Sequence, residues 1–213
     1  AALVGAALAA AAALAQTSLV VRAGLHGSKR AELYLSALVA VSVVGAVLGL
    51  VVGRAVTRGR PGARAVGLAV LSVLLTGWLG FLLLVQRSIG STLWQGVFTA
   101  IPWVTAVIAG LGLALCPPRS RRAVLAWLAA LLVVWVGPAL LAAGGYVAGS
   151  RAMLSSSPPS EWLDAGWDVL RAALLPANHA RWPFVLTILV GLVGLLPGVA
   201  GSATKDRART VDP

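Results

Sequence analysis

The stretch AVLAWLAALLVVWVGPALLAAGGYVA, residues 123–148, contains no Asp, Glu, Lys, Arg or His along its whole length. An α-helix rises about 1.5 Å per residue, so this stretch is longer than the ~30 Å hydrocarbon core of a bilayer. Backbone that crosses lipid must be helical or closed into a barrel, because lipid offers no hydrogen-bond partners. The stretch therefore predicts a transmembrane helix.

Five other stretches share this apolar character and are also long enough to cross a bilayer. They cover residues 1–21, 33–53, 65–85, 93–116 and 184–203. We expect the first to be a retained helix rather than a signal peptide, because it is uniformly apolar over a spanning length. The sequence thus predicts an all-α fold, a polytopic transmembrane helix bundle of about six spans, in a single membrane domain over residues 1–213.

The composition agrees with a membrane protein. The chain is 59% hydrophobic and 11% charged, which leaves too little polar surface for a soluble globule. Its 17 Lys and Arg against 6 Asp and Glu would indicate nucleic-acid binding in a soluble protein. Here the basic residues lie in short connections beside the apolar stretches, as in membrane proteins. We therefore expect the lipid bilayer as a partner and no nucleic acid.

The distribution of basic residues predicts the orientation. Ten of the 17 lie in the connections 54–64 and 117–122 and in the tail 205–209. The positive-inside rule places these segments in the cytoplasm, together with both termini. The excess of Arg over Lys and the abundance of Ala and Gly are typical of a GC-rich bacterial genome. We expect a multi-pass protein of the bacterial cytoplasmic (inner) membrane, with a cytoplasmic C-terminus.

Small residues recur at intervals of four within several of these stretches. Such a spacing forms a smooth stripe on one helix face, along which a second helix can approach closely. The stripes could dock a partner subunit or a second copy of the chain, or they could pack within the bundle. The predicted helix-packing residues are Gly45, Gly49, Gly53, Gly145, Gly149, Gly194 and Gly198.

The connection between residues 150 and 182 differs from all the others, because it predicts an amphipathic helix at about 160–175. Prolines before it and Pro176 after it mark its ends. Acidic side chains and Arg171 fall on one face, while Trp162, Leu163, Trp167, Leu170 and Leu174 fall on the other. We expect an interfacial helix that lies flat at the outer membrane surface. It could serve only as a connector, or it could bind a partner through Glu161, Trp162, Asp164, Trp167, Asp168 and Arg171.

Uncharged polar residues are present within two of the predicted spans. Ser72 and Thr76 are four residues apart in one span, and Gln95 and Thr99 are four apart in the next. If the two helices lie side by side, these four residues could line a thin polar path. The alternative is that the hydroxyls bond carbonyl oxygens of their own helix and that the glutamine reaches the lipid headgroups.

The sequence lacks the residues that most membrane enzymes need. The predicted spans contain none of the Asp, Glu, His or Arg side chains that such sites usually require. His26 and His179 lie in short connections and would need further ligands, such as Glu32 or Asp164, to hold a metal. We find no H-E-x-x-H, G-x-S-x-G or Walker A motif. We therefore expect no metal, no cofactor and no enzymatic activity.

These observations favour a non-catalytic integral membrane subunit of a larger cell-envelope complex. Its small-residue stripes would dock partner helices, and its outer helix would contact an extracytoplasmic component. The alternative is the permease domain of a transporter, because six spans with an amphipathic element before the last resemble the layout of exporter permeases of the ATP-binding-cassette class. The connections 54–64 and 117–122 are short for a helix that couples to an ATPase, which favours the subunit hypothesis.

Overall fold

The structure of the protein is a computed structural model that describes eight single residues between 5 and 19 and residues 29–87, 92–149, 159–178 and 181–195. All regular structure in these ranges is helical, which confirms the all-α prediction for the described part of the chain. The helices are α2 (Lys29–Arg58), α3 (Pro61–Arg87), α4 (Thr92–Ala114), α5 (Arg121–Gly149), α6 (Pro159–Leu174) and α7 (Arg181–Val193).

Four of these helices contain a segment that is long and apolar enough to cross a membrane. The segments are Val39–Arg58, Pro61–Leu83, Gly96–Ala114 and Arg121–Val147. They indicate a membrane-embedded protein. Helix α7 is also apolar, but its 13 residues rise only about 20 Å. Most of the predicted span 1–21 and residues 196–203 of the last span lie outside the described residues, so the count of six spans stays a prediction.

The chain divides into two compact units, residues 1–57 and 58–213. The first contains nearly all of α2, and the second contains α3 to α7. In α2 the three glycines Gly45, Gly49 and Gly53 follow one another at four-residue intervals. Their packing partner stays a prediction, because it depends on how the first unit meets the second or another chain.

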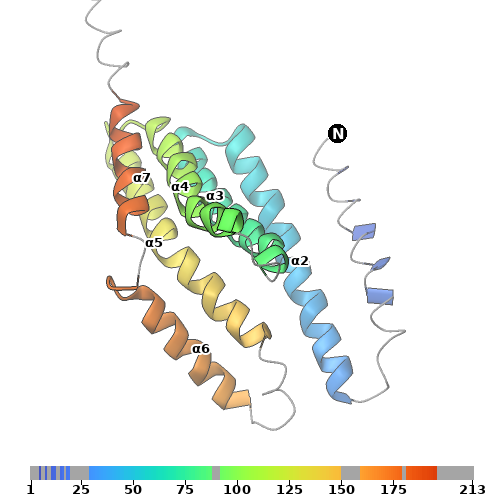
Figure 1. Ribbon diagram of the computed structural model, residues 1–213. Helices are drawn as coiled ribbons and strands as arrows, with labels where there is room; N and C mark the ends of the chain where they lie inside the picture. Colours follow the sequence, from blue (N-terminus) through green and yellow to red (C-terminus); the bar gives the residue numbers. More distant parts are fainter. Residues whose placement is uncertain are drawn as a thin grey trace, which may run out of the picture. The chain divides into compact units, whose positions relative to one another are not determined.

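In the second unit, α3 packs against α4 and α5, while α4 also packs along α7 and α5 along α6 (Figure 1). Glycine allows the closest of these approaches. A Cβ atom at Gly110 would lie 2.6 Å from the Cβ of Val190 and 2.8 Å from the carbonyl oxygen of Thr187. Gly191 faces Leu113 in the same way, so α4 and α7 run side by side in the same direction.

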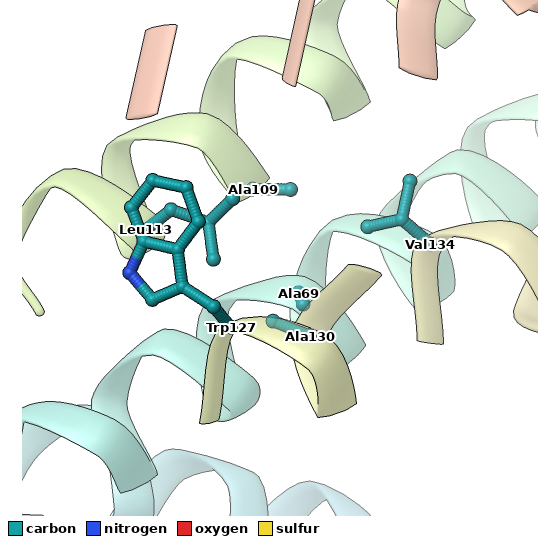
Figure 2. Packing of buried hydrophobic residues seen from close by; sticks show 6 residues of the cluster. All are labelled: Ala69, Ala109, Leu113, Trp127, Ala130 and Val134. Atoms are coloured by element: carbon teal, nitrogen blue, oxygen red, sulfur yellow. The ribbon is translucent and has the colours of Figure 1, made fainter. Parts of the chain in front are cut away.

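The apolar core of this unit lies where α3, α4 and α5 meet, near the α4–α5 turn. It consists of small side chains around one large ring, and Figure 2 shows the indole of Trp127 beside Leu113. Trp127 Nε1 donates a hydrogen bond of 2.6 Å to the carbonyl oxygen of Cys116, so this ring also ties α5 to the end of α4. The cluster comprises Ala69, Ala109, Leu113, Trp127, Ala130 and Val134.

Helix α6 begins at a proline, carries Glu161 in its first turn and ends shortly before Pro176, in keeping with ordinary helix boundaries. It returns along α5 in the opposite direction. Gly166 lies against Val147, and further along α6 Ala173 lines the same cavity as Pro138. The helix predicted at 160–175 is therefore present and packs on the second half of α5. Its position at an outer membrane surface stays a prediction.

Candidate functional site at the junction of α6 and α7

A cavity of about 280 Å³ lies where the chain passes from α6 to α7. All five helices of the second unit contribute to its lining. Three prolines lie around it, Pro102 from α4, Pro138 from α5 and Pro183 from the first turn of α7. Because Pro138 has no N–H, the carbonyl oxygen of Val134 lacks its usual partner four residues on. Val134 also lines the cavity.

The cavity lies at the depth of the apolar helices, not beyond their ends. Pro102 is six residues inside the apolar segment Gly96–Ala114, which corresponds to about 9 Å. Pro138 is nine residues from the end of Arg121–Val147, or about 13 Å. The interruption of helical structure between the end of α6 at Leu174 and the start of α7 at Arg181 therefore falls well within the length of α4 and α5. At such a depth, irregular backbone is tolerated where it is buried in protein or lines a cavity.

Three threonine side chains from three helices line this cavity. Their hydroxyl groups can donate to carbonyl oxygens of their own helices, Thr76 to Ser72 at 2.9 Å, Thr105 to Ile101 at 3.2 Å and Thr187 to Pro183 at 3.1 Å. The Oγ1 atoms of Thr76 and Thr105 also contact each other across α3 and α4. A hydroxyl has one proton and two lone pairs, so the remaining capacity of these groups is to accept hydrogen bonds.

The rest of the lining is mostly apolar. Phe184 lies edge-on to Trp135, with the ring centroids 5.1 Å apart. Asn178 Nδ2 donates to the carbonyl oxygen of Ala172 at 2.9 Å, which closes the end of α6 and leaves the amide oxygen as an acceptor. Among the described residues that line the cavity, none is charged. Such a lining suits a neutral molecule. Its polar side chains are three threonine hydroxyls and one asparagine amide, which are all uncharged.

The structure places the predicted polar residues at different sites. Thr76 reaches the cavity, and Ser72 is fully buried one turn earlier, with Oγ donating 2.8 Å to Ala69. Thr99 is exposed and donates 2.8 Å to Gly96, and the side chain of Gln95 lies outside the described residues. Thr76 thus meets Thr105 instead of Thr99. The hydroxyls bond to their own helices, as the alternative interpretation expected.

Thr105 and Thr187 were not among the predicted site residues. Each follows a cavity-lining proline by about one helical turn, Thr105 three residues after Pro102 and Thr187 four residues after Pro183. Residues three or four apart share a helix face. A threonine one turn after a proline in an apolar helix is therefore a signal that could have pointed to this site.

The exposed face of α6 is the second candidate site. Glu161, Asp164 and Asp168 are all exposed, as predicted for its polar face. The face that packs on α5 contains Gly166, whose Cβ position lies 2.7 Å from Val147 Cγ2. Of the residues predicted for the apolar face, Trp162, Leu170 and Leu174 are half-buried.

Two large apolar residues of α6 remain outside its contact with α5. Leu163 is 73% exposed and Trp167 is 53% exposed. The guanidinium carbon of Arg171 lies 5.1 Å from the centroid of the Trp167 ring, within the range of a cation–π interaction. The helix therefore presents an aliphatic side chain, a stacked indole and three carboxylates together.

The glycines predicted to pack in the second unit have different surroundings. Gly194 lies against Ala114 of α4, while no heavy atom lies within 4 Å of a Cβ placed at Gly145. For Gly149 only the helical backbone is described, and Gly198 lies outside the described residues. Most close contacts involve glycines outside the four-residue repeats. These are Gly62, Gly77, Gly110, Gly112, Gly137, Gly166 and Gly191.

The described residues contain no group of three or more His, Cys, Asp or Glu side chains that could hold a metal ion. Both histidines, His26 and His179, lie outside the described ranges. Comparison with protein-family models, with curated proteins and with solved structures finds no match for this chain. A functional assignment therefore depends on the two sites themselves.

Proposed function

We propose that the protein is a non-catalytic integral subunit of a larger cell-envelope complex in the bacterial cytoplasmic membrane. The observation that supports this most is the exposed face of α6. Its contact with α5 uses the Gly166 side of the helix and leaves Leu163, Trp167 and three carboxylates exposed. The acidic side chains on this face, next to exposed Leu163 and Trp167, support docking of a protein partner there.

The partner that fits this face carries basic and apolar side chains. Indole rings are enriched at the energetically important centres of protein interfaces, and complementary charge speeds association and favours the correct partner. Arg171 stacks on Trp167 and so restricts the ring before binding, which lowers the entropy cost of association. We propose a segment with Lys or Arg beside apolar residues, belonging to another membrane subunit.

The positive-inside rule supports an extracytoplasmic location for this face. The turn between α4 and α5 carries Arg119, Arg121 and Arg122, all of them exposed, which favours the cytoplasm for this end of α5. Helix α6 follows the other end of α5 and packs there, beside Val147. On this orientation the partner contacts α6 from outside the cytoplasm.

The test is a charge reversal on the free face of α6. The variant Glu161→Lys, Asp164→Lys, Asp168→Lys is purified from native membranes in mild detergent, and co-purifying proteins are identified. We expect the partner to be lost while thermal stability stays unchanged, because exposed ion pairs contribute only about 0–1 kcal/mol. The control Glu161→Asp, Asp164→Glu, Asp168→Glu keeps the charges and should keep the partner. A charge-reversed protein that retains every partner would rule out docking at this face.

The cavity favours a second candidate, the permease domain of a transporter. Substrate sites of many transporters lie near the middle of the membrane, where interrupted helices meet. The interruption between α6 and α7 beside a cavity, within the length of α4 and α5, resembles that arrangement. An ATPase among the co-purifying proteins would favour this candidate, and its absence together with retained envelope partners would favour the subunit.

A further inference from the structure

We propose that the cavity at the α6–α7 junction binds a small uncharged molecule with an apolar body and one hydrogen-bond donor. This inference does not depend on docking at the free face of α6. Ala173, the residue of α6 that lines the cavity, faces α5, whereas Asp164 and Asp168 are exposed on the helix. The two sites can therefore be tested separately.

The volume limits the size of the molecule. A dry apolar cavity of about 150 Å³ accommodates benzene, and ligand pockets in proteins begin at about 300 Å³. The cavity here measures about 280 Å³. It can therefore hold a fused bicyclic ring of about ten heavy atoms whole, whereas a nucleotide or a whole lipid would extend beyond it.

The lining favours a donor on the ligand. The hydroxyl proton of Thr187 is directed to Pro183 O, and the hydroxyls of Thr76 and Thr105 have acceptors in their own helices and in each other. Asn178 uses one of the two N–H groups of its amide on Ala172 and keeps the other, together with its carbonyl oxygen. What the three threonine hydroxyls still offer is lone pairs. A ligand N–H or O–H would satisfy an acceptor, whereas an apolar molecule would leave it unpaired at a free-energy cost.

The shape of the lining indicates that the space is a feature of the fold. Ala106, Ala139 and Ala173 present only methyl groups to it from three different helices, and the first two are almost fully buried. Side chains of the surrounding helices therefore leave the volume open. The prolines Pro102 and Pro138 add fixed rings in place of backbone N–H donors. The result is a rigid apolar wall around a few acceptors.

The experiment compares indole with benzofuran, which have the same fused-ring shape but differ in the donor N–H. Each is titrated by isothermal calorimetry into the purified chain in detergent, with empty micelles as the blank. We expect saturable binding of one indole per chain, with a Kd on the order of 1 mM or tighter for a ligand of this size. Benzofuran should bind about threefold to tenfold more weakly, which corresponds to one neutral hydrogen bond.

Variants then locate the binding site. Thr105→Val should remove most of the preference for indole while benzofuran still binds. Thr99→Val is the matched control, because Thr99 lies in the same helix, bonds back to Gly96 and does not line the cavity. Ala139→Leu fills the space from α5 and should abolish binding of both compounds, and Ala173→Leu repeats this test from α6. Thermal unfolding of each variant confirms that it is folded.

Three results would each overturn the proposal. The first is an absence of saturable heat above the micelle blank. The second is equal affinity for indole and benzofuran in the unmodified chain. The third is binding that persists in both folded cavity-filling variants, which would place the ligand in the detergent or elsewhere on the protein.

Discussion

The two ends of the α3–α7 unit share helices α3, α4 and α5 but are packed differently. Near the α4–α5 turn, Trp127 fills the space between small residues, and its N–H reaches across to a carbonyl oxygen of Cys116. At the α6–α7 junction, hydroxyls bond mainly within their own helices and about 280 Å³ stays open. At the first end the indole hydrogen bond ties two helices together, whereas at the cavity end the Thr76–Thr105 contact joins α3 and α4 beside an open space.

The largest loss of stability is expected from a substitution where α4 contacts α7. Gly110→Leu would place a side chain against Val190 and the backbone of Thr187, so the two helices must separate. Overpacking costs about 1–3 kcal/mol or more, and each kcal/mol lowers the melting temperature of a chain this size by about 2–4 °C. We expect a loss of roughly 10 °C, or no folded protein, in a thermal melt in detergent. Gly144→Leu is the control, because no atom lies within 4 Å of its Cβ position. Equal losses in the two variants would contradict close packing of α4 on α7.

A smaller loss of stability should follow from removing only the hydrogen bond between Trp127 and Cys116, near the α4–α5 turn. Trp127→Phe keeps an aromatic ring but leaves the carbonyl oxygen of Cys116 without the indole N–H, at a cost of about 1–3 kcal/mol. The melting temperature should fall by a few degrees. Trp103→Phe in α4, where the side chain is 46% exposed, should change it by much less. If the two tryptophans behave alike, the contact between Trp127 and Cys116 does not hold α5 to α4.

At the cavity end, loss of a hydroxyl should matter less. Thr187→Val removes a bond of 3.1 Å to Pro183 that lies within α7 and does not join two helices. We expect a cost of about 1 kcal/mol, below that of Trp127→Phe, measured in the same thermal melt. A larger loss than for Trp127→Phe would reverse the comparison and assign the stability of the unit to the cavity end.

The smallest effect concerns Cys116, which follows the end of α4. Burial raises the pKa of this thiol above its ordinary value of 9.0, and the residue is only 2% exposed. The folded state therefore holds the thiol proton more tightly than the unfolded state, so stability from this group is present below about pH 9 and is lost as the pH rises further. Maleimide should label the folded protein far more slowly than the protein in denaturing detergent, and Trp127→Phe should increase the folded rate. Equal rates in the folded and denatured protein would contradict burial of the thiol.

The sequence alone predicted most of the helical elements of the described chain. The stretch 123–148 lies within α5, and the helix expected at 160–175 is α6, Pro159–Leu174. These predictions succeed because the length of an apolar run, the 3.6-residue period and flanking prolines are local properties of the chain. The exposure of Glu161, Asp164 and Asp168 followed from the same period.

Only the tertiary structure decided which of these faces meet. The possible polar path would have brought Thr76 and Thr99 together, but Thr76 meets Thr105. Gly166 contacts Val147 although it belongs to none of the predicted stripes. Helical periodicity gives the direction of each side chain around the axis of its helix. It does not give which helix lies next to it, or the direction and register of that helix. In a membrane, lipid tails are as apolar as the core, so hydrophobicity does not distinguish the packed face of a helix from its lipid-facing side. Close shape complementarity makes that distinction, and it exists only once the helices are assembled.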